Sequence, residues 1–224
     1  MLPLLLLAHD LYLMPERFVV KPGETIRIAV HNGDSFPESD GPPSLPRLRG
    51  AGPNVRLDGK RAVYDAKAVG SVLHVRTIPN FLSLESKKFA NYLRSEGLTQ
   101  IPSGDKPSRE LYSKYAKTIL RTGLADFAQT AGLAIEFIPQ SDPSTGKFRV
   151  VVMLHGRPEG NLAVSLMGAG YDKRIGRTAP DGSISVTVPK PGVWKLHTVA
   201  MKPAHDKSQA DWESFWASLT FEVQ

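Results

Sequence analysis

The chain has 224 residues, of which 41% are hydrophobic and 22% are charged, a balance typical of globular proteins and unlike that of disordered or fibrous chains. It contains no cysteine, which excludes disulfides and thiolate metal sites, so a bound metal must take histidine, carboxylate or backbone ligands. The formal net charge of +6 comes without a nucleic-acid-binding motif, so we expect no nucleic-acid partner.

The chain begins with an almost wholly apolar run, Met1–Leu7, which ends at Ala8 before the polar pair His9 and Asp10. This run is too short to cross a bilayer, which takes about 20 apolar residues. It is typical of the apolar part of a signal peptide, although the positively charged start is missing. We therefore expect residues 1–8 to be a residual or truncated signal peptide, and the protein to be periplasmic or secreted and not integral to the membrane. The alternative is a first β-strand that begins the fold.

Residues 9–82 have the pattern of a small N-terminal β domain. Ile26, Ile28 and Val30 recur at every second position, which predicts a strand with one buried face. The segment 32–56 is rich in Gly, Pro and Ser, which predicts a long loop. The strands expected here are Phe18–Val20, Ile26–Val30, Ala62–Tyr64 and Ser71–Thr77.

A helical period follows in residues 83–123, which we expect to form a connector of two short helices. In the first, aromatic and apolar residues share one helical face, and a glycine stands where a C-terminal cap is expected. In the second, apolar residues recur every four positions. The residues that predict these helices are Phe89, Tyr92, Leu93 and Gly97 for the first, and Leu111, Tyr115 and Ile119, within Pro107–Arg121, for the second.

Residues 131–224 have the pattern of a C-terminal β-sandwich, because short apolar strands alternate with Pro- and Gly-rich turns. The sequence therefore predicts a mainly β protein, with two immunoglobulin- or transthyretin-like β-sandwich domains and two short helices between them. The boundary is expected between Gly123 and Ala131. The six strands expected in the C-terminal half are Ile135–Phe137, Phe148–Leu154, Leu162–Leu166, Ile184–Val188, Val193–Met201 and Leu219–Val223.

The turns of the C-terminal half follow a recognisable order. G-x-P stands at Gly156–Pro158, T-x-x-D-G at Thr178–Gly182 and P-G-x-W at Pro191–Trp194. This order resembles the transthyretin-like and carboxypeptidase-regulatory-like sandwiches, and it implies a sandwich of that kind.

Further segments along the chain share a second likeness: His9–Asp10, Lys21–Glu24, Gly33–Ser39, Phe89–Gly97, Tyr112–Lys117 and Ala210–Leu219. Together they resemble the bacterial family catalogued as domain of unknown function 4198, often labelled a nickel-uptake transporter family. The resemblance implies an exported protein with a signal peptide and no established chemistry. In that family a histidine often precedes the methionine of the strand after P-G-x-W. Here Ala200 holds that place, and His197 lies three residues earlier.

Motifs of catalysis are missing from the sequence. It has no G-x-S-x-G elbow, no H-E-x-x-H, no P-loop and no G-x-G-x-x-G. Its carboxylates form no recognisable acid and base pair. We therefore expect a protein that is not an enzyme.

Metal binding is the sharper expectation, with His9, Asp10 and His197 as the candidate ligands. If export removes the leader, His9 offers an α-amino and an imidazole nitrogen, and Asp10 adds an oxygen. Such nitrogen and oxygen sites suit Ni(II) or Cu(II), so nickel, cobalt or copper is the expected metal. His197 must join through the fold, as must the alternatives His31 and His205, because no His-x-His spacing brings them close.

Two other groups allow more than one interpretation. The acidic loop with Asp34 and Asp40 is either a hard-cation site that includes Glu38 or a solvated loop. The aromatic group of Trp212, Phe215 and Trp216 is either a platform on which sugars stack or part of the core.

The function expected from these patterns is that of an extracytoplasmic binding protein, which binds a transition metal such as nickel or cobalt and assists its uptake. Its expected partner is a membrane metal transporter or another envelope protein. The alternative is a metal-independent β-sandwich interaction module that recognises protein or glycan at the cell surface.

Overall fold

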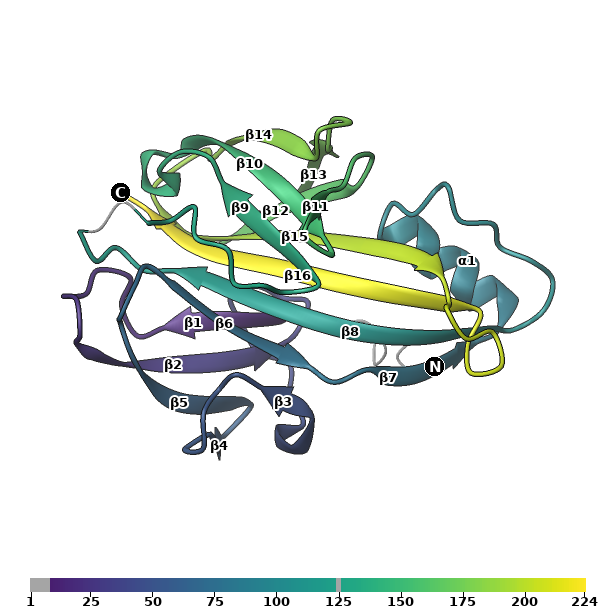
Figure 1. Ribbon diagram of the computed structural model, residues 1–224, viewed down its shortest axis with the longest axis horizontal. Helices are drawn as coiled ribbons and strands as arrows, with labels where there is room; N and C mark the ends of the chain where they lie inside the picture. Colours follow the sequence, from purple (N-terminus) through teal and green to yellow (C-terminus); the bar gives the residue numbers. More distant parts are fainter. Residues whose placement is uncertain (1–8, 124–125) are drawn as a thin grey trace.

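The computed structural model describes residues 9–123 and 126–224 and is mainly β (Figure 1). Over these residues the chain forms sixteen strands and one α-helix. The expected signal-peptide remnant, residues 1–8, lies outside the described residues. Within the described part of the chain, no helix combines the length and apolarity that crossing a membrane requires.

An eight-stranded sheet runs through the centre of the molecule (Figure 1). Its three longest strands have twelve residues each: β8 (Ser108–Ile119), β15 (Gly192–Pro203) and β16 (Trp212–Val223). Strand β16 pairs with β15 in antiparallel and with β8 in parallel orientation. The order is β13-β12-β15-β16-β8-β6-β3, and β7 also pairs with β8. The remaining strands are β3 (Leu48–Arg49), β6 (Val72–Thr77), β7 (Asn80–Leu84), β12 (Ala163–Gly168) and β13 (Tyr171–Arg177).

The N-terminal sheet packs on one face of the central sheet. Successive side chains of a strand point to opposite faces. On β16 the hydroxyls of Ser218 and Thr220 donate hydrogen bonds to the carbonyl oxygens of Leu11 and Leu13 in β1, at 2.6 and 2.7 Å. The N-terminal sheet has the order β1-β2-β5-β4. Its strands are β1 (Leu11–Pro15), β2 (Thr25–Asn32), β4 (Arg56–Asp58) and β5 (Arg61–Lys67).

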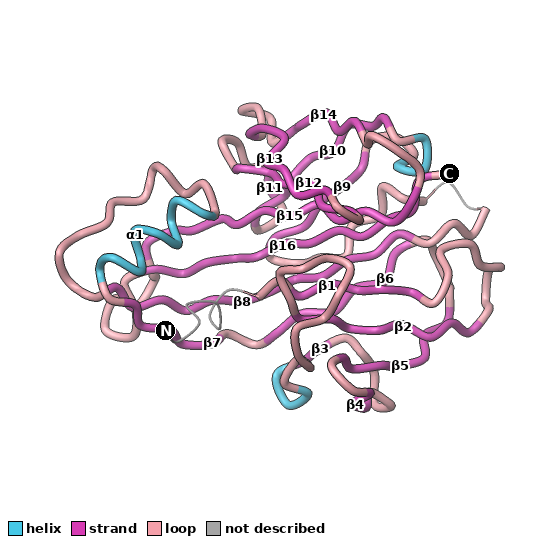
Figure 2. The backbone as a smooth tube through the Cα atoms, turned by 180° about the vertical axis from the view of Figure 1, so that it is seen from behind, coloured by secondary structure: helices cyan, strands magenta, loops and turns pink. Residues whose placement is uncertain are grey.

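The C-terminal sheet packs on the opposite face. Leu219 and Phe221 of β16 point there and share an apolar core with Ile135, Phe137 and Phe148. The central sheet is therefore covered by one small sheet on each face (Figures 1 and 2). The C-terminal sheet consists of β9 (Ile135–Pro139), β10 (Lys147–Leu154), β11 (Arg157–Pro158) and β14 (Ser183–Thr187).

Helix α1 (Ser86–Ser95) covers the end of the central sheet at which β8 and β16 begin (Figure 1). Phe89 and Leu93 pack in one cluster with Val199 and Trp216, so α1 lies on the same face as the N-terminal sheet. Gly97 follows the helix with φ +69°, as predicted for its C-terminal glycine. Two short 3-10 helices complete the fold, η1 (Leu45–Arg47) and η2 (Pro143–Thr145).

The prediction of a second helix over Pro107–Arg121 was wrong, because this segment contains strand β8. A spacing of four residues is also a multiple of two, so Leu111, Tyr115 and Ile119 share one face of a strand as well as of a helix. The polar residues between them hid the strand pattern. Lys117 lies on that same face, yet it is buried against Glu136 of β9.

The two-domain organisation is not confirmed, because the central sheet takes strands from both halves of the chain. Strands β3, β6 and β7 come from the N-terminal half, and β12, β13, β15 and β16 from the C-terminal half. The mainly β fold is confirmed, and each of the six strands expected after residue 131 falls within a strand or overlaps one: β9, β10, β12, β14, β15 and β16.

Candidate functional site

The candidate site lies on the face of the central sheet that carries both the N-terminal sheet and α1. Three elements meet there. Asp10 directly precedes β1, His197 projects from β15, and Glu96 is the C-terminal cap of α1. All three side chains are largely withdrawn from solvent.

Asp10 is the centre of a buried charge network. Its Oδ2 accepts a hydrogen bond from Lys195 Nζ at 2.5 Å, and its Oδ1 lies 3.0 Å from Nδ1 of His197. The other ring nitrogen, Nε2, lies 3.0 Å from Oε2 of Glu96. Both nitrogens of His197 thus face carboxylates, an arrangement that suits the doubly protonated ring.

The charges in this network hold one another in the ionised state. Burial opposes the charge on His197, but Asp10 and then Glu96 raise the pKa of His197 to about 10. Burial likewise opposes the carboxylate of Asp10, yet His197 and Lys195 hold the pKa of Asp10 well below its usual range. The network therefore ties β1, β15 and α1 together through paired charges.

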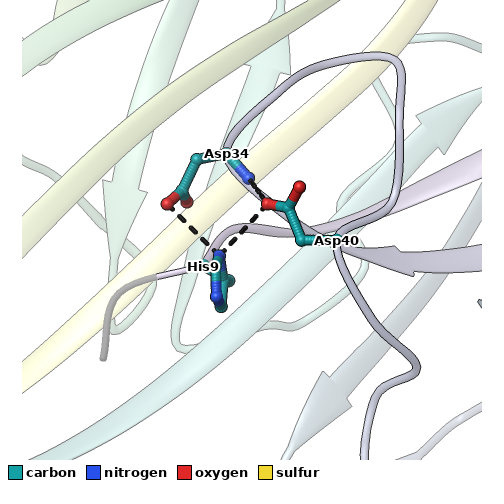
Figure 3. Close-up of side chains that lie close together, drawn as sticks. All are labelled: His9, Asp34 and Asp40. Atoms are coloured by element: carbon teal, nitrogen blue, oxygen red, sulfur yellow. Dashed lines mark hydrogen bonds and ion pairs between the residues drawn. The ribbon is translucent and has the colours of Figure 1, made fainter. Parts of the chain in front are cut away.

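His9 forms a second group with two aspartates of the loop after β2 (Figure 3). Its Nδ1 lies 3.2 Å from Oδ2 of Asp34 and 3.3 Å from Oδ2 of Asp40. The pairing of β1 with β2 explains the meeting, because Leu11 stands opposite Asn32. The residues just before β1 and just after β2 are therefore neighbours.

The loop that carries these aspartates is held in place by hydrogen bonds. The backbone N–H of Asp34 donates to Oδ2 of Asp40 at 2.8 Å. Tyr12 of β1 donates from its hydroxyl to the carbonyl oxygen of Glu38. Ser39 Oγ donates to the carbonyl oxygen of Lys60 at 2.6 Å. The loop thus holds its two carboxylates in fixed positions against His9.

The arrangement around His9 Nδ1 has the chemistry of a cation site. That nitrogen is buried and makes no hydrogen bond among the described residues, although two carboxylate oxygens stand beside it. Metal bonds to imidazole nitrogen and carboxylate oxygen are about 2.0–2.2 Å long. If one ion bound His9 Nδ1 and either of these oxygens at such distances, the nitrogen–ion–oxygen angle would be roughly 100°. Burial raises the pKa of Asp34, and the neighbouring His9 opposes that shift.

The structure divides the predicted ligands between the two groups. Asp10 and His197 contact each other, with both oxygens of the one and both nitrogens of the other engaged. His9 instead faces Asp34 and Asp40, which the sequence showed only as an acidic loop. The pairing of β1 with β2 joins them. The sequence pattern predicts no strand at Leu11–Pro15, because these residues follow directly on the apolar leader.

The aromatic group of β16 belongs to the core. Trp216 is buried and stacks on Tyr92 of α1 with a centroid separation of 5.8 Å. Trp212 packs against the same cluster. Phe215 points to the opposite face and packs against the C-terminal core. The three rings therefore form no common platform.

Comparison with curated proteins finds no match. Residues 6–202 match the family described as Domain of unknown function (DUF4198). The match takes in the His9 group, the buried Asp10 network and most of the central sheet. It agrees with the resemblance carried by the segments from His9 to Lys117, and the protein belongs to the DUF4198 family.

Proposed function

We propose that this protein is an extracytoplasmic metal-binding protein whose site consists of His9, Asp34 and Asp40. The observation that carries the proposal is the buried Nδ1 of His9, which has no hydrogen-bond partner in the described residues and stands 3.2 and 3.3 Å from two carboxylate oxygens. A divalent transition ion would be ligated by all three groups at once. Nickel, cobalt and copper accept such nitrogen and oxygen ligands.

The nitrogen that faces the aspartates is the one best suited to chelation by a processed N-terminus. Cleavage after Ala8 would turn the main-chain nitrogen of His9 into an amine. That amine and Nδ1 close a six-membered ring with a metal, because Cα, Cβ and Cγ are the only atoms between them. Two nitrogens and two carboxylate oxygens suit the tetragonal preference of Cu(II) and Ni(II).

In this proposal Asp10 and His197 support the site without binding the ion. Their atoms are engaged with Lys195 and Glu96, and a protonated imidazole has no lone pair to offer. The neighbouring peptide is fixed as well, because Lys114 Nζ donates to the carbonyl oxygen of His9. The network thus sets the backbone from which His9 projects.

The proposed role is assistance in metal uptake outside the cytoplasm. The apolar leader before His9 supports export, and export is what would generate the chelating amine. The ion would then pass to a membrane metal transporter or another envelope protein. The chain would act as a carrier and not as an enzyme.

Calorimetric titration with Ni²⁺ and Cu²⁺ tests the proposal on a protein that begins at His9. We expect one ion per chain, and at least tenfold weaker binding for His9→Ala, Asp34→Asn and Asp40→Asn, each of which removes one ligand. A protein with extra residues before His9 should lose the amine and bind more weakly. His205→Ala is the matched control, because His205 is an exposed histidine outside the site.

Equal affinity of the parent protein, His9→Ala and both aspartate variants would show that the ion binds elsewhere. If neither ion binds at all, the metal-independent interaction module becomes the better account of the protein.

A further inference from the structure

A small cavity of about 160 Å³ lies beside His9, on the side of Lys114. Its wall includes His9 and residues of several elements, among them Arg47 of η1, Asn80 of β7, and Tyr112 and Lys114 of β8. Asp34 and Asp40 do not line it. The cavity therefore shares His9 with the proposed metal site but does not include its two carboxylates.

The charge of this wall is positive. Arg47 and Lys114 both line the cavity, and its described lining contains no aspartate or glutamate. Neither cation forms an ion pair with any described carboxylate, although the chain contains many such pairs elsewhere. Asp10 and Asp34 favour the charge of Lys114 from a greater distance, but two cations that share a cavity without a directly paired carboxylate remain costly to bury. An anion between them lowers that cost.

Both cations keep donors available. Lys114 is buried, and its Nζ hydrogen bonds only to the carbonyl oxygen of His9 among the described residues, which leaves two of its three N–H groups. Burial lowers the pKa of Lys114 to about 8. One terminal nitrogen of Arg47, Nη2, donates hydrogen bonds to the carbonyl oxygen of Pro79 and to Oδ1 of Asn80. The Nε of Arg47 is buried and has no acceptor among the described residues.

A hydroxyl group adds to these donors. Asn80 Nδ2 donates to the hydroxyl oxygen of Tyr112, so the hydroxyl proton of Tyr112 is directed to another acceptor. Thr77 Oγ1 similarly accepts from the backbone N–H of Lys114 at 3.0 Å, and its own proton remains to be donated. The polar wall thus offers several hydrogen-bond donors to a ligand that must supply the acceptors.

We propose that this cavity binds a small carboxylate. Lys114 Nζ and the guanidinium of Arg47 would each donate to one of its oxygens, and Tyr112 would add a third hydrogen bond. Charge-assisted hydrogen bonds of this kind are the strongest that side chains make. A volume of this size suits a ligand of a few heavy atoms. The proposal stands without the metal, because it rests on cations and donors and not on His9 Nδ1.

Titration of the metal-free protein with sodium acetate, in a Tris buffer, tests this by following NMR shifts of the backbone amides near Lys114. We expect saturable binding, and at least tenfold weaker binding for Arg47→Gln and Lys114→Gln. Arg47→Gln keeps the test open if Lys114→Gln fails to fold, because Arg47 is only half-buried. The matched control is Arg49→Gln: Arg49 is exposed in β3 and donates to the carbonyl oxygens of Pro46 and Leu48.

Three results would overturn the proposal. One is a lack of saturation with acetate. Another is equal weakening in Arg47→Gln and Arg49→Gln. The third is tighter binding of sodium phosphate than of acetate, which would replace a carboxylate by a phosphate-like ligand.

Discussion

Asp10 is the residue whose charge holds two buried cations in place. Removal of one member of a buried ion pair leaves the others uncompensated and costs about 3–5 kcal/mol. We expect Asp10→Asn to lower the free energy of unfolding by that amount in urea denaturation. Asp65→Asn is the control, because Asp65 forms only exposed pairs, with Arg27 at 3.7 Å and with Arg56 at 4.0 Å; it should change stability by about 1 kcal/mol or less. Similar losses in both variants would refute the buried network.

His197 gives the same network a defined pH dependence. Its pKa is raised from 6.5 to about 10 in the folded protein, so its contribution to stability is complete below pH 6.5 and declines as the pH rises toward 10. We expect the stability difference between the parent protein and His197→Gln to be largest near pH 6 and to shrink toward pH 10. Urea denaturation at several pH values measures this. A difference that stays constant over that range would mean that His197 is not charged.

Sequence reasoning at the residue scale found the ionisable groups but not their partners. His9, Asp10 and His197 were the predicted ligands, and each does lie in one of the two groups. Lys195 and Asp10 are separated by 185 residues, and no spacing rule connects residues so far apart. Only the register of the strands brings these charges together.

At the scale of the elements, strand β8 and helix α1 enclose one buried carboxyl group, that of Glu110. Glu110 of β8 accepts a hydrogen bond from the hydroxyl of Tyr92 at 3.0 Å and another from Ser214. Burial raises the pKa of Glu110 from 4.5 to about 7. A raised pKa means that the protein is most stable with this group neutral, so its contribution to stability is lost as the pH rises from 4.5 through 7.

Glu110→Gln should remove the loss of stability that the Glu110 carboxyl group causes as the pH rises. We expect the stability of the variant, relative to the parent protein, to increase between pH 4.5 and 8 by an amount on the order of 3 kcal/mol, because each pKa unit corresponds to about 1.4 kcal/mol. Glu222→Gln in β16, where the side chain is only half-buried, is the control for the substitution itself. If the stability difference between Glu110→Gln and the parent protein stays constant from pH 4.5 to 8, the Glu110 carboxyl group is ionised over that whole range.

Elements were predicted well where a pattern allowed only one interpretation. The alternation in Ile26–Val30 gave β2, and the apolar face ending at Gly97 gave α1. The segment Pro107–Arg121 failed because its apolar spacing fits a helix and a strand equally. Its buried Lys117 and Thr118 depend on partners in β9 and β16, which local sequence does not contain.

The whole molecule is organised around the parallel pair of β8 and β16. Sequence patterns supplied most of the strands, but pairing between distant strands follows from the complete set of packed faces. Two separate sandwiches were the simplest assembly of the predicted strands. The structure instead places one sheet across both halves.

This sharing predicts that both halves unfold together. Hydrogen exchange in increasing urea should give the same free energy of opening for the backbone amides of β2 and β10, which lie in the sheets on opposite faces. Loss of β2 protection at lower urea than β10 would instead indicate two independent units.

The central claim is that His9, Asp34 and Asp40 bind one metal ion, and diffraction at the nickel absorption edge tests it most directly. Crystals of the protein that begins at His9, grown with Ni²⁺, should show an anomalous peak about 2.1 Å from His9 Nδ1 and from one oxygen of each aspartate. The peak should be missing from crystals of His9→Ala. A nickel peak that lies only at other residues, or the absence of any peak, would contradict the account.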